Sequence, residues 1–348
     1  MVRISDIVKV GQAAERPAQP TTSPRAVPPP SPVSVRPAIP AAIAPPRPLD
    51  FASPLSTSRQ LYEQLVAECQ QRFEQVQHEQ RLTLGQLPGL IQQAVQNLSA
   101  EDAELGWLSL SADGGFSLAH HGVHVALLAI SLGLERDMKP LELVDLGLAA
   151  ALHDVGMVPI AHLAHSQSQL DEQQRHHLRE HPLMSYRLFQ HCPNLPPLAL
   201  EVALQEHERC DGSGYPNRLT GSRISQPAQL VGVLDVYESL THDRPHRKRL
   251  VPSEAMRTLL HDHGAGFYTD VLRSFFRVVP IYPVGTWVRM NTGELAKVVS
   301  VTRQAMLSPT VSVLIDPHGQ RVAHPTTLDL STHALCSIVS AVAEPSLS

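Results

Sequence analysis

Two apolar segments rich in alanine and leucine, residues 118–135 and 140–154, place the strongest constraint on the fold. Alanine and leucine favour helices, and both outnumber the β-branched residues here, so the two segments predict buried helices rather than strands. The second segment ends on two strongly polar residues, His153 and Asp154. Burying such a pair costs several kcal/mol unless it is compensated, and a bound cation would compensate both side chains.

Helical patterns extend on both sides of these segments. Apolar residues recur at helical spacing from Thr57 to Val76, which predicts a long amphipathic helix, and a second helix is expected around Pro88 to Leu98. The range from about 57 to 277 shows no alternation of strand and helix, which excludes a doubly wound sheet. The predicted fold class is mainly α, an all-α bundle of at least seven helices, with further helices at about 171–191, 196–207, 226–241 and 253–262.

The two ends of the chain have a different texture. The first eleven residues could form one short strand, and the Pro/Ala/Ser-rich segment from about Gln12 to Pro54 predicts a disordered linker. Beyond Val278, short strands are expected at 285–290, 295–302 and 310–315, with turn signals between and after them. We therefore expect a disordered segment (1–54), N-terminal helices packing on the core (55–104), a helical domain (105–280) and a small β-rich extension (281–345).

Charge and cysteine content narrow the function classes. Lys plus Arg (28) nearly balances Asp plus Glu (33), for a formal net charge of −5, which gives no support to binding a nucleic-acid polymer or an anionic membrane. The four cysteines are widely spaced and form no CxxC pair, which argues against a zinc ribbon or disulfide framework. The N-terminus has no apolar run long enough for a signal peptide, and no window approaches the roughly 18 apolar residues of a membrane span. The predicted location is therefore the cytoplasm.

Residues able to ligate a divalent metal are spread over several predicted helices. A metal-dependent hydrolase needs histidine and carboxylate side chains that converge on one point and leave positions open for water and substrate. A single histidine among apolar residues is more often a hydrogen-bonded core residue than a ligand, whereas the His153–Asp154 pair and Asp235, after an apolar run, both require compensation. The candidates are His121, His153, Asp154, His181, His207 and Asp235.

A Gly/Pro-rich stretch, Asp211 to Pro216, follows His207 directly. Asp-Gly and Gly-x-x-Pro are common turn signals, so the stretch alone would indicate a plain surface turn. Its place immediately after a ligand-rich helix end favours a loop that borders the substrate or docks a partner.

Together these motifs resemble the HD-GYP family of metal-dependent phosphodiesterases, which hydrolyse the bacterial second messenger cyclic di-GMP. The His153–Asp154 dyad matches the family's His-Asp pair, and the family loop DGxGYP matches Asp211, Gly212, Gly214, Tyr215 and Pro216. The resemblance covers about residues 105 to 320 and implies an HD-type helical bundle. It also implies a site of two or three metals held by His121, His153, Asp154, His181, His207 and Asp235, and a substrate contact at Arg244.

Three positions depart from the family pattern. Met157 stands where the family carries a lysine that would assist at the phosphate, and Glu206 replaces the first of two paired histidines. A glutamate can still ligate, and it would shift the preference from soft metals toward Mn, Fe(II) or Mg. Ser117 replaces a carboxylate one turn before His121, so we expect two metals rather than three. His120 is an alternative to His121, because the register is ambiguous by one residue.

The resemblance implies hydrolysis of cyclic di-GMP to pGpG and/or GMP, with two metals bridged by Asp154 and with His153 and Asp154 as catalytic residues. The main alternative is a degenerate relative that binds cyclic di-GMP, or a GGDEF-domain protein, without hydrolysis; Met157 and Glu206 favour it. An HD-type nucleotidase would leave Asp211 to Pro216 unexplained. The long helix after Thr57 either caps the core or forms a homodimer.

Overall fold

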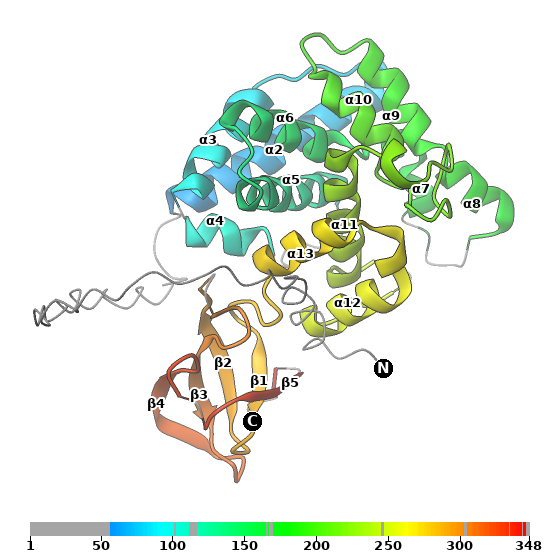
Figure 1. The fold of residues 1–348 in the computed structure, drawn as a ribbon. Coiled ribbons are helices and arrows are strands. Elements are labelled where there is room, and N and C mark those ends of the chain that lie inside the picture. Colours follow the sequence, from blue (N-terminus) through cyan, green and yellow to red (C-terminus); the bar gives the residue numbers. More distant parts are fainter. Residues whose placement is uncertain are drawn as a thin grey trace, which may run out of the picture. The chain divides into compact units, whose positions relative to one another are not determined.

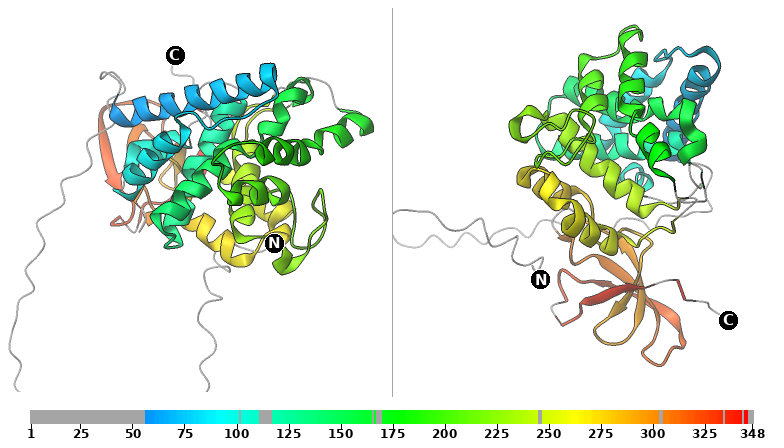
Figure 2. Two further views of the ribbon diagram at one scale, coloured as in Figure 1. Left: turned by 90° about the horizontal axis from the view of Figure 1, so that it is seen from above. Right: turned by 90° about the vertical axis from the view of Figure 1, so that its right-hand side faces the viewer.

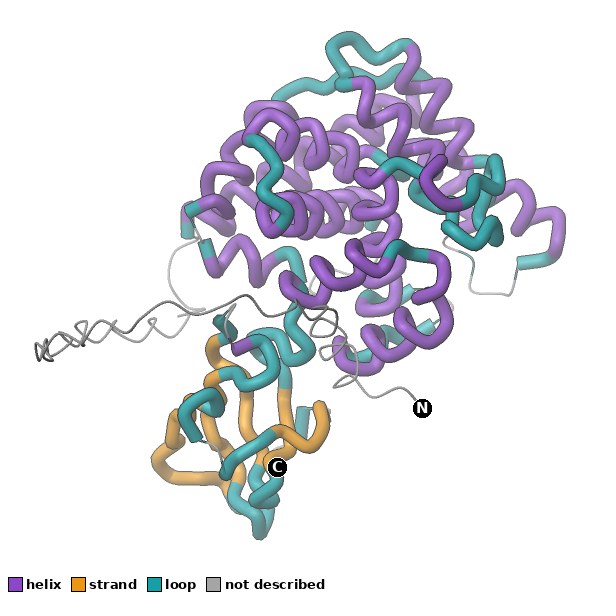
Figure 3. Tube along the Cα trace, in the orientation of Figure 1, coloured by secondary structure: helices purple, strands orange, loops and turns teal. Residues whose placement is uncertain are grey.

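The computed structural model describes residues 56–100, 102–110, 117–164, 166, 170–244, 247–302, 305–333, 335–342 and 344–345. The strand considered for the first eleven residues and the disorder expected for residues 12–54 lie outside this part of the chain. Helices fill the described chain up to residue 278 and strands follow (Figure 3). The helices are α2 (Thr57–Glu79), α3 (Leu87–Ser99), α4 (Ala103–Leu108), α5 (Leu118–Glu135), α6 (Pro140–Leu152), η1 (Val155–Ile160), α7 (Ala161–Ala164), α8 (Glu172–Leu178), α9 (His181–Gln190), α10 (Pro197–Gln205), α11 (Gln226–Thr241), α12 (Pro252–Thr258) and α13 (Thr269–Val278).

Helix α5 lies at the centre of the helical part, with α2, α6 and α11 packed against it (Figures 1 and 2). Its N-cap is Ser117, whose side chain accepts a hydrogen bond from the Ala119 amide at 3.2 Å. The helix carries its own alanine, leucine and valine side chains on nearly every face, as a fully buried helix requires. Gly122 allows α6 to approach closely, since a Cβ there would lie 2.3 Å from the Ala151 carbonyl oxygen. The mainly α prediction is confirmed.

Two of the core segments are also apolar enough to span a membrane by length and composition. Their mean hydropathies are 1.3 for Leu118–Glu135 and 1.5 for Pro140–Leu163. The expectation that no window approaches this length is therefore wrong by that measure. In the fold, 72% and 78% of the respective windows are buried inside the protein. Buried core helices pass the same test of length and composition.

Several helices differ in extent from those predicted. The helix expected at 171–191 is divided into α8 and α9, because Pro182 lies in the first turn of a new helix that begins at His181. The helix expected at 253–262 ends as α12 and continues as a π-helical turn, Leu259–His263. Helices α4 and α13 were not anticipated.

The strands form one antiparallel sheet in the order β4-β3-β2-β1-β5. Alternate residues of β1 to β3, including Val288, Ala296 and Val311, pack into a separate apolar core. The three expected strands are confirmed, the first two of them shorter than expected. The last two were missed: β4 is almost entirely exposed and carries Pro325, so it lacks an alternating pattern. The strands are β1 (Trp287–Met290), β2 (Leu295–Ser300), β3 (Thr310–Ile315), β4 (Arg321–Asp329) and β5 (Ile338–Val342).

Candidate metal centre

The helical part brings the seven predicted ligands together from five places in the chain. Helix α5 supplies one, the end of α6 two, the start of α9 one, the end of α10 two and the middle of α11 one. They form two groups, and within each group the potential ligand atoms lie within 4.8 Å of one another. One group is His121, His153 and Asp235, and the other is Asp154, His181, Glu206 and His207; together they are called the centre below.

Asp154 lies between the two groups. Its Oδ2 is 3.6 Å from His121 Nε2, and its Oδ1 is 3.2 Å from His181 Nε2. In the first group, His121 Nε2 is 3.3 Å from both Asp235 Oδ1 and His153 Nε2. One carboxylate thus faces both groups, as a residue that bridges two cations would.

Three of the histidines are oriented through their outer nitrogens. The Nδ1 atoms of His153 and His181 each lie 2.7 Å from a main-chain oxygen, of Ala150 and Leu178 respectively. These contacts place the N–H on Nδ1 and leave Nε2 toward the centre, which is the usual arrangement of a metal-binding histidine. His121 has a carboxylate in that place, with Nδ1 2.5 Å from Glu238 Oε2.

The charges of the centre need a cation. Both carboxylate oxygens of Glu206 and Oδ1 of Asp154 are buried without a hydrogen-bond partner among the described residues. Burial, with Asp154 and Asp235 nearby, raises the pKa of Glu206 well above its ordinary value. Burial lowers the pKa of His121, but the neighbouring Glu238 carboxylate outweighs it and raises this pKa to about 10. In the metal-free protein, a proton on His121 therefore supplies positive charge. The residues present therefore fit divalent metal ions.

The loop that follows the centre is packed against it. The Tyr215 ring stacks on His207 at 4.7 Å between centroids, and a Cβ on Gly214 would lie 2.5 Å from the His207 carbonyl oxygen. Glu208 is fully buried and accepts hydrogen bonds from the amides of Asn217 (2.6 Å) and Leu219 (2.8 Å). These contacts position His207, a candidate metal ligand, through the loop that follows it.

The other loop residues have local contacts. Asp211 is exposed, and its Oδ1 accepts hydrogen bonds from the amide and hydroxyl of Ser213 at 2.9 and 2.7 Å. Gly212 has φ of +80°, a left-handed conformation that favours glycine, and the Tyr215–Pro216 peptide bond is cis. The contact of this loop with substrate stays a prediction.

Two further positions that the family resemblance singled out, Met157 and Arg244, have defined surroundings in the fold. Met157 belongs to an apolar cluster with Ile160 and Leu163 and is 8% exposed. Arg244 lies beside the centre, with NH2 3.1 Å from Glu238 Oε2. The two residues after it are outside the described chain.

The register ambiguity on α5 is resolved by the geometry. His121 faces the centre, whereas the His120 ring lies 6.4 Å from the rings of both Tyr62 and His124, away from the seven ligands. Sequence reasoning missed Glu238, which is 3% exposed and contacts His121 directly. Its spacing of three from Asp235 on an otherwise apolar helix was the available signal, because that spacing puts both carboxylates on one face.

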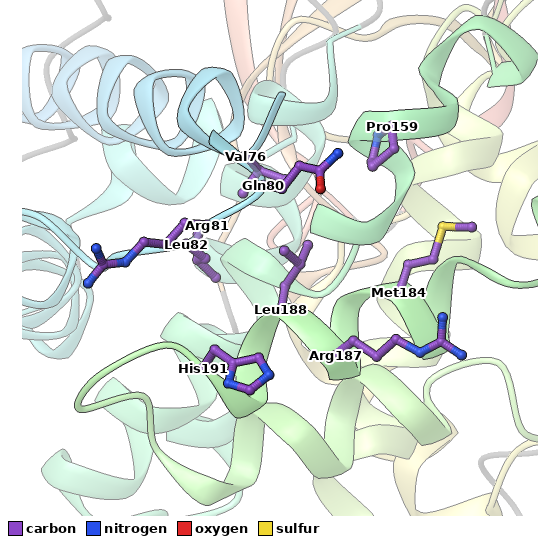
Figure 4. A pocket seen from close by; sticks show the side chains of 9 residues that line it. All are labelled: Val76, Gln80, Arg81, Leu82, Pro159, Met184, Arg187, Leu188 and His191. Atoms are coloured by element: carbon purple, nitrogen blue, oxygen red, sulfur yellow. The ribbon is translucent and has the colours of Figure 1, made fainter. Parts of the chain in front are cut away.

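A cavity of about 310 Å³ lies elsewhere, between the end of α2 and α9 (Figure 4). Its walls combine apolar side chains such as Val76 and Leu188 with Arg187 and His191. None of the seven ligands lines it, so it is separate from the centre.

A protein-family model described as an HD domain matches residues 86–270, which is more than half of the chain. The chain belongs to the HD domain family. Members of this family are metal-dependent, in agreement with the ligands that converge here. A second model, a KOW domain associated with HD domains, matches residues 287–348, the region that contains the five strands.

Curated relatives agree with the resemblance identified from the motifs. The chain is 33% identical over 201 residues to cyclic di-GMP phosphodiesterase PA4108 of Pseudomonas aeruginosa, covering 58% of this chain and 48% of that protein. It is 25% identical over 196 residues to cyclic di-GMP phosphodiesterase PdeB of Borreliella burgdorferi, covering 56% and 52%. The chain thus spans about half the length of these relatives.

A further relative and one solved structure complete the comparison. A 3'3'-cGAMP-specific phosphodiesterase of Vibrio cholerae is 31% identical over 140 residues, covering 40% of this chain and 31% of that protein. The structure of Bd1817, an HDG"Y"P protein from Bdellovibrio bacteriovorus, superimposes with a TM-score of 0.51 at 20% identity, covering 63% of this chain and 70% of that one. At that identity the superposition supports the fold alone.

Proposed function

We propose that this chain is a metal-dependent phosphodiesterase that hydrolyses cyclic di-GMP to pGpG and/or GMP in bacterial second-messenger signalling. The observation that carries the proposal is the convergence of seven candidate metal ligands around buried carboxylate oxygens that have no hydrogen-bond partner in the part of the chain that the structure describes. The relatives that are named cyclic di-GMP phosphodiesterases support the substrate.

The centre has the composition expected for two divalent cations. One would be held by His121, His153 and Asp235 and the other by His181, Glu206 and His207, with Asp154 able to contact both. Because three carboxylates accompany the imidazoles, Fe, Mn or Mg suits the set better than a softer metal. When bound, such ions supply Lewis-acid activation of water and of the phosphodiester.

The chain's own residues would orient the substrate. Arg244 carries a guanidinium group at the edge of the centre, held at 3.1 Å by Glu238, and can bind a phosphate or a guanine. The loop from Asp211 to Pro216 borders the same place through the stacking of Tyr215 on His207. Both are proposed as substrate-binding elements.

A receptor for cyclic di-GMP, or a module that binds GGDEF-domain proteins, is the second candidate. Met157 favours it, since this side chain is buried in an apolar cluster and offers no charge to a phosphate. The relatives' names support the enzyme instead.

The apolar face of α2, including Leu61, Leu65 and Phe73, is buried against the chain's own core, which favours a capping role over a homodimer contact. A cytoplasmic location remains a prediction.

A turnover assay separates the candidates. The full chain, loaded with Mn²⁺ or Fe²⁺, is incubated with cyclic di-GMP and, in parallel, with 3'3'-cGAMP, and linear products are quantified. We expect hydrolysis of cyclic di-GMP that is lost in the His153→Ala, Asp154→Ala double variant and kept in His261→Ala, which changes an exposed histidine. Binding without turnover, with every divalent metal tried, would establish the receptor instead.

A further inference from the structure

A third group of potential ligands lies on the other side of the Glu238 carboxylate. It consists of His124 on α5, Glu238 on α11 and His242 at the C-cap of α11, and their potential ligand atoms lie within 4.8 Å of one another. All three are buried, with exposed fractions of 1%, 3% and 9%. The sequence reasoning that predicted the centre assigned none of the three as a ligand.

Glu238 uses its two oxygens differently. Oε2 is 2.5 Å from His121 Nδ1 and 3.1 Å from Arg244 NH2, both good charge-assisted hydrogen-bond distances. Oε1 is 3.4 Å from His124 Nδ1 and 3.2 Å from His242 Nδ1. These two distances exceed the usual N–H···O separation of about 2.9–3.0 Å. They match the roughly 3.3 Å edge of a tetrahedron whose ligands lie about 2.0–2.1 Å from a zinc ion.

The two imidazoles are also placed for ligation. His124 Nε2 is 2.8 Å from the Tyr62 hydroxyl, so the outer nitrogen of this ring has a partner, as is usual for a ligating histidine. His242 Nδ1 lies 3.0 Å from the main-chain oxygen of Glu238, so ion binding there requires its N–H to move to Nε2.

We propose that His124, Glu238 and His242 form an additional cation site whose preferred ion is Zn²⁺. Two imidazoles and one carboxylate are a zinc ligand set, whereas the carboxylate-rich centre suits harder ions. This site does not involve Ser117, the position considered above for a third metal. The ion would join α5 to the end of α11, and His242 is two residues before Arg244. It would therefore hold the segment that presents Arg244 to the centre.

Metal counting on a chain with a disabled centre tests the proposal. The full-length His153→Ala, Asp154→Ala variant is stripped with a chelator, titrated with Zn²⁺, freed of unbound metal and measured by inductively coupled plasma mass spectrometry. We expect about one retained Zn²⁺ fewer when His124→Ala and His242→Ala are added. Adding His261→Ala instead, which removes one exposed imidazole, should leave the zinc content unchanged. Equal zinc content with and without His124 and His242 would overturn the site.

A second measurement does not depend on how the His124 and His242 variants fold. X-ray absorption is measured on Zn²⁺ bound to the His153→Ala, Asp154→Ala variant, which retains His124 and His242. The spectrum should show a four-coordinate ion with two imidazole ligands and oxygen. Co²⁺ in the same protein should give the intense visible absorption of tetrahedral cobalt. Six-coordinate, oxygen-only spectra would refute the proposal. Neither readout involves turnover, so failure of the phosphodiesterase proposal would leave these results standing.

Discussion

Two buried glutamates flank His207 and have opposite surroundings. Glu206 and Glu208 are 1% and 0% exposed, and both follow the end of α10. Glu208 accepts two backbone N–H bonds from the loop that returns at Asn217 and Leu219. Neither carboxylate oxygen of Glu206 has a hydrogen-bond partner among the residues that the structure describes; the nearby His153 Nε2 is 3.4 Å from Oε2 without hydrogen-bond geometry.

The difference shows that burial alone does not mark a functional carboxylate. A buried carboxylate that is hydrogen-bonded to two amides stabilises the loop it holds. A buried carboxylate without partners is unfavourable in the protein alone and becomes favourable when a cation arrives. We therefore expect Glu208 to stabilise the loop and Glu206 to bind a metal ion. The same substitution at the two positions should have opposite consequences.

The largest expected effect is on metal affinity in Glu206→Gln. Loss of the negative charge should weaken binding of Mn²⁺ or Fe²⁺ by about 100-fold or more, because changing even the partner of a ligand commonly costs 10–100-fold. Competition with a chelator of known affinity measures the change. Glu208→Gln, two residues away, is the matched control and should weaken binding far less. Equal losses in the two variants would remove the distinction between them.

The next effect in size is on stability in Glu208→Gln. The amide retains one acceptor but its NH₂ group faces a backbone donor, so the free energy of unfolding should fall by roughly 1–3 kcal/mol with or without metal. Thermal unfolding should show a midpoint lower by about 2–4 °C for each kcal/mol. An unchanged midpoint would mean that the loop does not depend on this carboxylate.

A smaller effect of opposite sign is expected for Glu206→Gln in the metal-free protein. Burial raises the pKa of Glu206 in the folded protein. The favourable contribution of Glu206 to folding is therefore complete only below its pKa in the unfolded chain, and it is lost as pH rises through its pKa in the folded protein. Near neutral pH the glutamine variant should be more stable than wild type by about 1 kcal/mol, and the advantage should shrink toward about pH 4. Urea unfolding at several pH values measures it. Saturating metal should reverse the order, and a wild type that is more stable without metal would contradict the argument.

Much of the fold follows from local pattern, and the site follows less completely. Helices α5 and α11 begin and end at the predicted residues, because each has a continuous apolar run with a serine N-cap. Strand β4 could not be predicted, because its exposed surface gives no alternation. The seven candidate ligands and their convergence on one site were predicted from the motifs and the family resemblance, whereas their division into two groups and the distances within each group come from the fold.

Two contacts lay beyond sequence reasoning for a physical reason. The spacing from Asp235 shows which face of α11 carries Glu238, but its contacts with His121 on α5 and with Arg244 beyond the end of α11 form only in the folded chain. Glu208 likewise acquires its role only when the chain turns back at Asn217 and Leu219. Whether a buried charge is satisfied is a tertiary property.

The smallest effect is expected at Met157, which tests whether a position beside the centre acts in chemistry or in packing. Its side chain contacts the apolar cluster of Ile160 and Leu163, so Met157→Leu conserves volume and character and should change the free energy of unfolding by less than about 1.5 kcal/mol. Turnover of cyclic di-GMP should stay within about twofold of wild type. Met157→Lys introduces the residue of the family pattern, and at 8% exposure its ammonium group must either reach the centre or remain buried among apolar side chains. Increased turnover with lower stability would show that the centre accepts this charge. A large loss of turnover in Met157→Leu would instead give the sulfur a role that the packing does not explain.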